Sequence, residues 1–201
     1  IFSTPFTAAL IREKFKEKKI DIGNNLKIVD LNGTVDLKPF KIEFITLTHS
    51  ILEPNGLRIE TPAGNILHTG DWKCDPNPLI GDKIDSKRLK QIGEKGVLAM
   101  ICDSTNVFSI GRAGSEFDVR KNLLKVMDRL KNRIIVTSFA SNVARMESIF
   151  YCAEKLGRQI SLVGRSMHRI YKAAKQCGYL KDIIEPIDPR DAKKISREKI
   201  I

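Results

Sequence analysis

The sequence predicts an α/β protein built in two parts. Residues 1–109 contain short runs of β-branched and aliphatic residues separated by turn residues, a pattern typical of strands joined by turns. Residues 110–201 alternate apolar, strand-like runs with amphipathic helical segments, which is typical of β-α-β units on a parallel sheet. Glycines interrupt the pattern within residues 106–114. We therefore expect one domain over residues 1–109 and a second over residues 110–201.

The first domain is expected to begin with a helix at residues 5–18 and to continue mainly as strands. The expected strands cover residues 26–31, 41–48, 56–61, 65–69 and 97–102. We expect the last of them to be buried and a short helix at residues 86–92 to precede it. The sequence Thr61-Pro-Ala-Gly64 predicts a hairpin turn, because proline and glycine both favour turn conformations.

The second domain is expected to begin with a helix that Ser115 caps. Ser115 and Asp118 have the spacing of a capping box, in which the serine side chain satisfies a free N–H group of the first turn. Apolar residues follow at helical spacing, namely Phe117, Leu123, Leu124, Met127 and Leu130. The alternation then predicts strands at 133–137 and 159–163 and helices at 142–156 and 167–177. Gly157 and Gly178 follow these two helices, where glycine commonly ends a helix.

Composition places the chain among globular proteins. Its 201 residues are 42% hydrophobic and 29% charged, which excludes disordered and membrane-embedded classes. No apolar run approaches the roughly 18 residues of a membrane span, and residues 1–10 lack the basic start of a signal peptide, so we expect a cytoplasmic protein with no membrane partner. Without a CxxC pair, the cysteines are expected to be reduced and mostly buried. They are Cys74, Cys102, Cys152 and Cys177.

Positive charge is concentrated in the second domain. Residues 1–109 carry 15 basic and 14 acidic residues, whereas residues 110–201 carry 20 and 10, a net charge of +10. Such an excess favours a polyanionic partner such as nucleic acid, because cationic side chains attract phosphates. The alternative is a solvated basic surface that only maintains solubility.

Two strand-to-helix junctions in the second domain are candidate phosphate-binding sites. Helix N-termini present free N–H groups and the positive end of the helix dipole, and Arg side chains can bind phosphate in a bidentate manner. The candidate residues are Ser138, Ser141, Asn142, Arg165 and Ser166, within the sequences SFASN and GRSM. The alternative is that Ser141 and Ser166 are ordinary helix caps.

Three segments of the first domain place potential metal ligands directly after apolar strands. These ligands are His49 in THS, Asp71 in TGDWK and Asp103 in CDSTN. Each residue also has a structural interpretation, since a single histidine after a strand is commonly structural and aspartate commonly begins a turn. We expect His68 and His168 to be structural residues.

Together these segments resemble ribonuclease J, of the β-CASP subgroup of the metallo-β-lactamase superfamily. The resemblance is carried by LTHSILEPNGLRIETPAGNILHTGDWKCDP, VLAMICDSTNVFSIGRAGSE and VTSFASN, which occur in this order and extend over nearly the whole chain. It implies a partial metallo-β-lactamase αββα sandwich over residues 1–109, followed by part of a β-CASP parallel-sheet α/β domain over residues 110–201.

The resemblance also implies a function, namely zinc-dependent hydrolysis of RNA phosphodiester bonds in RNA processing and decay. In that family two zinc ions activate a hydroxide for attack on RNA. The match implies that His49 is a metal ligand, that Asp71 bridges both metals and that Asp103 is an acidic residue beside the catalytic site. Asp71 and Asp103 are thus the implied catalytic residues, and the two serine-containing junctions match the start of the RNA-binding domain.

Some family features are not in this sequence. The HxHxDH signature, which supplies most of the zinc ligands, does not occur, and neither do the later β-CASP histidines. Leu52 stands where the family commonly has proline. We therefore expect an internal fragment that is inactive alone, with an incomplete zinc site, and whose partners are RNA and the remaining pieces of the enzyme, with homo-oligomers in the complete enzyme. The alternatives are a non-catalytic module that binds RNA or nucleotides and a purely structural subunit.

Overall fold

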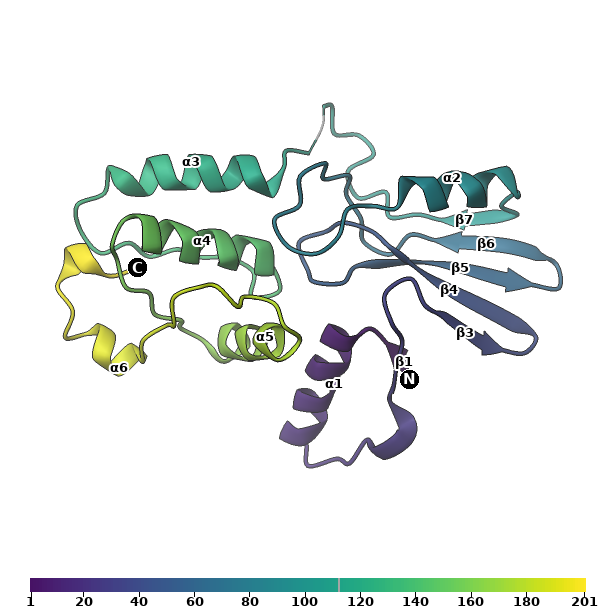
Figure 1. Ribbon diagram of the computed structural model, residues 1–201, viewed down its shortest axis with the longest axis horizontal. Helices are drawn as coiled ribbons and strands as arrows, with labels where there is room; N and C mark the ends of the chain where they lie inside the picture. The colour runs from purple at the N-terminus through teal and green to yellow at the C-terminus, as the bar shows by residue number, and fades with distance from the viewer. Residues whose placement is uncertain (112) are drawn as a thin grey trace. The chain divides into compact units, whose positions relative to one another are not determined.

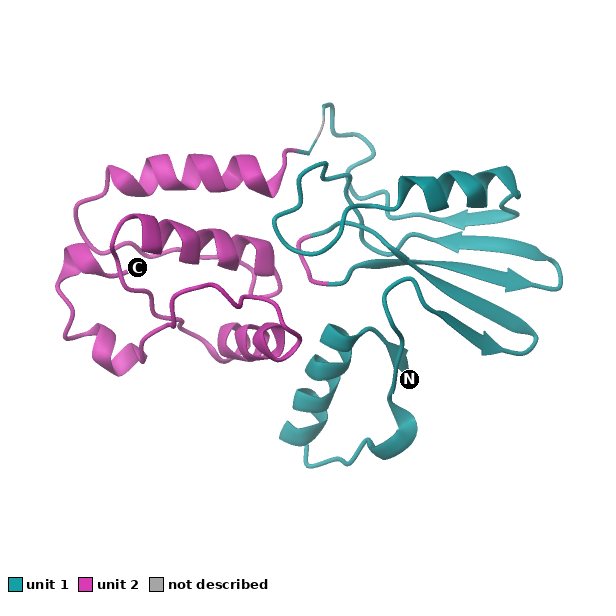
Figure 2. Ribbon diagram, in the orientation of Figure 1, with its two compact units in different colours: residues 1–49, 53–113 teal, residues 50–52, 114–201 magenta. Residues whose placement is uncertain are grey.

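The structure is a computed structural model that describes residues 1–111 and 113–201, and it divides into two compact units (Figures 1 and 2). Unit 1 comprises residues 1–49 and 53–113, and unit 2 comprises residues 50–52 and 114–201. Unit 1 contains the main β-sheet and unit 2 is mainly helical. The predicted α/β fold class is confirmed.

The main sheet of unit 1 has five strands in the order β3-β4-β5-β6-β7 (Figure 1). Neighbouring strands are antiparallel except for β6 and β7, which are parallel. The strands are β3 (Thr34–Leu37), β4 (Phe40–Thr46), β5 (Asn55–Thr61), β6 (Gly64–His68) and β7 (Ala99–Ile101). The sequence analysis missed β3, in which only Val35 is buried.

The predicted hairpin turn joins β5 to β6. Thr61 pairs with Gly64, and the Thr61 hydroxyl accepts hydrogen bonds from the backbone N–H groups of Ala63 and Gly64, both at 3.2 Å. Gly64 has φ +142°, a backbone conformation that residues other than glycine rarely adopt. The turn prediction is therefore confirmed, and its physical basis is the backbone freedom of this glycine.

A short N-terminal layer precedes the main sheet. Strands β1 (Phe2–Ser3) and β2 (Lys27–Ile28) pair in parallel, and helix α1 (Pro5–Glu17) connects them through a 3₁₀ turn. Pro5 occupies the first helical position, where its missing N–H group costs nothing. The helix agrees with the prediction, whereas the strand predicted at residues 26–31 is shorter than expected.

Helix α2 (Ser86–Glu94) is tied to the sheet by an ion pair. The guanidinium group of Arg88 donates to the carboxylate of Glu43 on β4, at 2.5 and 2.7 Å. These hydrogen bonds from Arg88 hold the pKa of Glu43 below its ordinary value. Ile92 on the same helix is buried.

Strand β7 is exposed, and the prediction of a buried strand there is wrong. Leu98, Met100 and Ile101 are all more than half exposed. The physical reason is that β7 is an edge strand of the sheet and, among the described strands, pairs with β6 alone. An apolar sequence indicates a tendency to be buried, but what covers the strand decides the outcome.

Unit 2 is built around helix α4 (Val143–Lys155). Eight of its thirteen residues are buried, including Phe150 and Cys152. Helix α3 (Glu116–Asp128) is joined to α4 by the Arg145–Glu116 ion pair at 3.2 Å. Helices α5 (Arg165–Gln176) and α6 (Pro189–Ala192) complete the unit. Within the described residues, no helix has both the length and the apolar character needed to cross a bilayer.

Local signals for the unit 2 helices are confirmed. The Ser115 hydroxyl accepts a hydrogen bond from the N–H group of Phe117 at 3.2 Å, so it caps α3. Gly157 and Gly178 adopt positive φ values of 60° and 84° directly after α4 and α5. Left-handed glycines at this position commonly end helices.

The strands predicted at residues 133–137 and 159–163 are not formed, and this part of the prediction is wrong. The segments pair only through isolated parallel bridges, Gln159 with Ile200 and Ser161 with Ile187, and a single hydrogen bond from Ile134 N–H to Ile200 at 3.3 Å. A strand requires a hydrogen-bonding neighbour along its length, and the residues that pair here extend for only one or two positions.

The cysteines differ from the prediction in burial. All four are free, as expected, but only Cys152 is buried, while Cys74 and Cys102 are exposed. The two exposed thiols lie in loops that follow β6 and β7, and Cys102 comes directly after the exposed strand that was predicted to be buried.

Candidate functional site

Three loops of unit 1 leave the same edge of the sheet. Strands β4, β6 and β7 run in one direction, because β5 is antiparallel to both β4 and β6, and β7 is parallel to β6. Their carboxyl ends therefore lie at one edge. The candidate residues His49, Asp71 and Asp103 follow these three ends.

The loop carrying His49 is fixed against the loop that follows Asp71. Thr48 and Lys73 form an antiparallel bridge, with the Lys73 N–H group donating to the Thr48 carbonyl at 2.9 Å. The Thr48 hydroxyl donates to the Lys73 carbonyl and accepts from the N–H group of Asp75 at 3.1 Å. Since Thr48 is buried, this contact fixes the backbone on the N-terminal side of His49.

The loop carrying Asp103 is held by the same segment. The Asp103 N–H group donates to the Thr69 hydroxyl at 3.0 Å, and the Asp103 carbonyl accepts from the indole N–H group of Trp72 at 3.3 Å. The structure therefore connects all three loops, and Trp72 and Thr69 are connecting residues that the sequence analysis did not identify. The contacts of Thr69 and Trp72 with Asp103 join residues more than 30 positions apart, and local patterns do not encode such contacts.

Asp103 is held in the ionised form by its surroundings. Its carboxylate accepts hydrogen bonds from the hydroxyl and the N–H group of Thr105, at 2.5 and 3.0 Å. These bonds lower the pKa of Asp103 below its ordinary value, and the charge of His49 contributes in the same direction. Thr105, also missed by the sequence analysis, could have been identified from the Asp-x-Thr spacing, which is typical of local side-chain-to-backbone turns.

His68 and Gly70 shape the turn that carries Asp71. The His68 Nδ1 atom accepts a hydrogen bond from the Gly70 N–H group at 3.0 Å. Gly70 has φ +59°, and a Cβ atom there would lie 2.9 Å from the Asn55 carbonyl oxygen. Only glycine fits this close approach of two backbones without displacement. Asp71 itself is exposed.

The candidate ligands do not make a complete metal site. In the part of the chain that the structure describes, no group of three or more His, Cys, Asp or Glu side chains is arranged to hold a metal ion. Zinc enzymes use three protein ligands and an open position for water or substrate. His49, Asp71 and Asp103 therefore do not fit a self-sufficient zinc centre.

The candidate phosphate-binding residues lie in unit 2 near the starts of α4 and α5. Asn142, not Ser141, caps α4, and its side chain accepts a hydrogen bond from the N–H group of Arg145 at 2.8 Å. Ser141 is exposed, while Ser138 is half-buried and donates to the Phe139 carbonyl at 3.4 Å. The interpretation of Ser141 as the helix cap is therefore wrong.

Helix α5 begins without a capping side chain. Gly164, with φ +105°, occupies the cap position, and Arg165 and Ser166 are exposed in the first turn. Ser166 therefore does not cap this helix either. Because no side chain at the cap position accepts from the first-turn N–H groups, this end of α5 retains the donors that an anion could bind.

One face of α5 is basic, a feature that the sequence analysis did not identify. Four side chains recur at spacings of three, four and seven, which places them on one face of a helix. They are Arg165, His168, Arg169 and Lys172. Ile170 and Ala174 on the opposite side are buried. The same spacing is visible in the sequence and could have indicated this surface.

Comparison with known proteins identifies relatives along the chain. The family model "Ribonuclease J, beta-CASP domain" matches residues 131–201, which lie in unit 2. Ribonuclease J of Sinorhizobium meliloti is 36% identical over 203 residues, covering 100% of this chain and 36% of that protein. The chain belongs to the ribonuclease J family. Ribonuclease J of Methanocaldococcus jannaschii is 38% identical, with 90% of this chain and 42% of that protein covered.

The chain spans 32% to 42% of the length of these ribonuclease J relatives; the lowest of these shares is that of the Thermus thermophilus protein, which is 37% identical. A solved structure of a protein of unknown function from Enterococcus faecalis matches all of this chain and 52% of its own, with a TM-score of 0.66 and 15% identity. That likeness shows the fold. The predicted family is confirmed, while the roles of the site residues stay predictions.

Proposed function

We propose that the chain is part of a ribonuclease J-like hydrolase that cleaves RNA phosphodiester bonds and depends on zinc. The observation that carries this proposal is the convergence of three loops at one edge of the unit 1 sheet, connected through Thr48–Lys73, Thr69–Asp103 and Trp72–Asp103 contacts. The names of the relatives support the substrate class, since they are ribonucleases.

In this proposal His49 and Asp71 would each supply a ligand to a zinc site. When bound, zinc would supply an activated water for attack on phosphorus. Asp103 would add negative charge beside that site, and the hydrogen bonds from Thr105 extend the ionised state of its carboxylate to lower pH. The remaining zinc ligands must come from polypeptide outside this chain, because a working site takes three or more.

RNA is the proposed partner of unit 2. The basic face of α5 and its uncapped N-terminus, with Arg165 and Ser166 exposed, would bind phosphates at the backbone. Ser138, Ser141 and Asn142 at the start of α4 form the second part of this proposed surface. Such contacts position RNA without reading its sequence.

A non-catalytic RNA-binding module is the second candidate. It is favoured by the net charge of +10 over residues 110–201 and by the incomplete set of metal ligands among the described residues. The two candidates predict the same RNA binding, so binding alone does not distinguish them.

The deciding experiment is reconstitution. The chain is co-expressed with polypeptides that carry the HxHxDH segment and the later β-CASP histidines of a ribonuclease J, and zinc content and RNA cleavage are measured in the purified complex. Zinc-dependent cleavage supports the hydrolase. A stable complex that binds RNA, but does not bind zinc and does not cleave RNA, supports the non-catalytic module.

A further inference from the structure

Residues 200 and 201 lie between two other extended segments of unit 2. On one side, the N–H group of Ile134 donates to the carbonyl of Ile200 at 3.3 Å. On the other side, Ile201 donates to the Gln159 carbonyl and accepts from the Ser161 N–H group, both at 2.9 Å. Ile200 pairs in parallel with Gln159. These two residues therefore have extended segments hydrogen-bonded to them on both sides.

The hydrogen bonds follow the regular alternation of a parallel ladder. Gln159 N–H donates to the Lys199 carbonyl, Ile201 donates back to Gln159, and Ser161 donates to Ile201. In a parallel ladder, the N–H and carbonyl groups of one residue point to the same neighbouring strand. If the same alternation continued, the next residues of a central strand would bond to the Ser161 carbonyl and the Val163 N–H group. On the other side it would use the Ile134 carbonyl and the Val136 N–H group.

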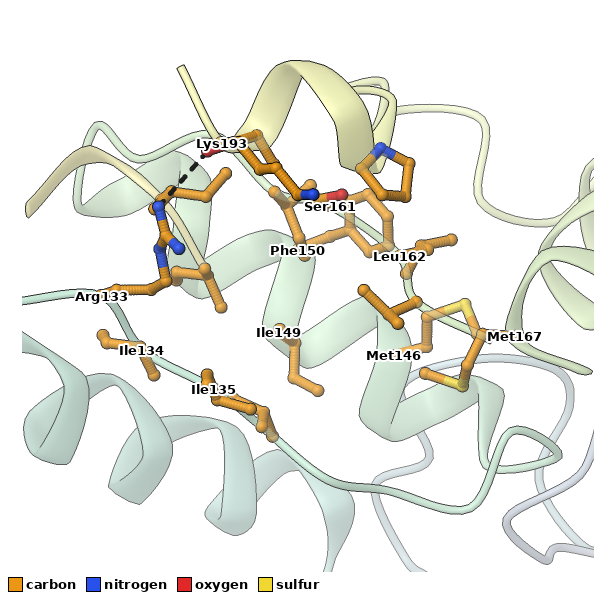
Figure 3. Close-up of a pocket in the computed structure, with 17 residues that line it drawn as sticks. Arg133, Ile134, Ile135, Met146, Ile149, Phe150, Ser161, Leu162, Met167 and Lys193 are labelled. Atoms are coloured by element: carbon orange, nitrogen blue, oxygen red, sulfur yellow. Dashed lines mark hydrogen bonds between the residues drawn. The ribbon is translucent and has the colours of Figure 1, made fainter. Parts of the chain in front are cut away.

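An apolar groove of about 550 Å³ continues from this point (Figure 3). Residues 133–136 line one wall, residues 160–163 line the opposite wall, and Ile200 and Ile201 lie among the lining residues. Met146, Ile149 and Phe150 of α4 also line the groove, and Figure 3 shows Ile149 between Ile134 and Leu162. The groove therefore has strand-like walls and a helical floor.

We propose that this groove binds an extended, aliphatic polypeptide strand, parallel to residues 133–136 and 160–163 and in line with Ile200–Ile201. Two observations select this occupant. The backbone hydrogen bonds at Ile200 and Ile201 already define the direction and phase of a strand there. The side chains of α4 that line the groove are Met, Ile and Phe, which favour aliphatic partners over polar ones.

Strand insertion also accounts for the exposure of the walls. Ile135 is 86% exposed and Val163 is 76% exposed, although both belong to segments that the sequence predicts as strands of a parallel sheet, whose strands are commonly buried. A central strand would pair both segments at once and convert the isolated bridges into ladders. Binding would thus order the walls as well as fill the groove.

The test extends the chain by five residues. A tail of Val-Thr-Val-Ile-Val is added after Ile201, and the matched control carries Val-Pro-Val-Pro-Val, which has the same length but cannot donate at two positions. Amide hydrogen exchange is measured at Val136 and Val163. We expect exchange at both residues to slow by about tenfold or more with the first tail only, because these amides become hydrogen-bonded. Equal exchange rates with the two tails would overturn the proposal.

A second measurement remains informative if the amide signals cannot be assigned. Both tailed chains are prepared with Phe108→Ala, which removes a fully exposed aromatic side chain of unit 1 as a competing apolar site. An apolar fluorescent dye should bind less to the Val-Thr-Val-Ile-Val chain than to the proline control, since the strand occupies the groove. Equal dye binding would contradict the proposal. Neither measurement uses RNA or metal, so the outcome is independent of the proposed function.

Discussion

The carboxylate of Glu53 accepts a hydrogen bond from the N–H group of Phe6 at 2.7 Å, joining the loop after β4 to the first turn of α1. Glu53 is buried, and Phe6 is fully buried. The first turn of a helix has free N–H groups and a positive dipole end, so an acidic acceptor stabilises it. Thr4, at the cap position, makes no side-chain hydrogen bond to the helix, and this role is left to Glu53, which is 47 positions from Phe6 in the sequence.

Replacing Glu53 should therefore destabilise unit 1. We expect Glu53→Ala to lower the free energy of unfolding by about 1–3 kcal/mol, because a buried N–H group loses its acceptor. Urea unfolding monitored by circular dichroism measures this change. The control is Glu94→Ala, which removes an exposed partner of Lys90 and should change stability by less than about 0.5 kcal/mol. Equal effects of the two substitutions would contradict the capping role.

The pH response of Asp103 should depend on Thr105. Hydrogen bonds from Thr105 lower the pKa of Asp103, so in the folded chain this carboxylate stays ionised to lower pH than in the unfolded chain. The corresponding stability is present above the unfolded pKa and is lost as pH falls through the lower, folded value. Thr105→Val removes the hydroxyl donor, and we expect the pKa to rise toward the ordinary value of 3.8. NMR titration of the Asp103 carboxyl carbon tests this, and an unchanged midpoint would refute it.

The isolated chain should not cleave RNA, whereas the reconstituted complex should. In that complex we expect Asp71→Ala to abolish cleavage and His49→Ala to reduce it severely, because each removes a proposed zinc ligand. His68→Ala and His168→Ala serve as histidine controls for the zinc content, which they should leave unchanged, because neither residue is a proposed zinc ligand. Turnover and zinc content are measured together.

Two outcomes would contradict that assignment. Chelator-sensitive cleavage by the purified 201-residue chain would show that the chain is active alone. Cleavage by a reconstituted complex carrying Asp71→Ala, with zinc content unchanged, would show that Asp71 is not a ligand.

RNA binding by unit 2 should be electrostatic and independent of sequence. Arg165→Ala should weaken binding of single-stranded RNA to a similar degree for different sequences and lower the slope of log affinity against log salt by about 0.7, the value for one phosphate contact to a single strand. Fluorescence anisotropy between about 50 and 200 mM salt measures this. Lys18→Ala removes an exposed charge of unit 1 and should leave the slope unchanged. If both variants behave alike, α5 is not the contact surface.

Helix ends and hairpin turns could be predicted because their signals are local. Ser115, Gly157 and Gly178 act on residues within one turn, and Thr61 and Gly64 act within a single hairpin. Strands are different, because they form only where a remote segment supplies hydrogen bonds. The apolar residues 133–137 and 159–163 have strand-like sequences but limited pairing, and β7 has an apolar sequence but an exposed position.

The candidate site shows the same division. The order of strands along the sheet brings the loops of His49, Asp71 and Asp103 to one edge, and this follows from residues at strand ends that the sequence already indicated. The connections between the loops could not be predicted. Trp72 and Thr69 reach Asp103 across 31 and 34 positions, and such contacts depend on how the sheet brings distant segments together.

Helix α4 also has a consequence for mutational tolerance. With eight of thirteen residues buried, including the polar Ser148, the helix has little surface on which a random substitution is neutral. In a library of single variants selected for folded chains, α4 should be depleted of substitutions more strongly than α5, whose basic face is turned to solvent. Under selection for folding alone, sequence variation should therefore accumulate in α5 rather than in α4.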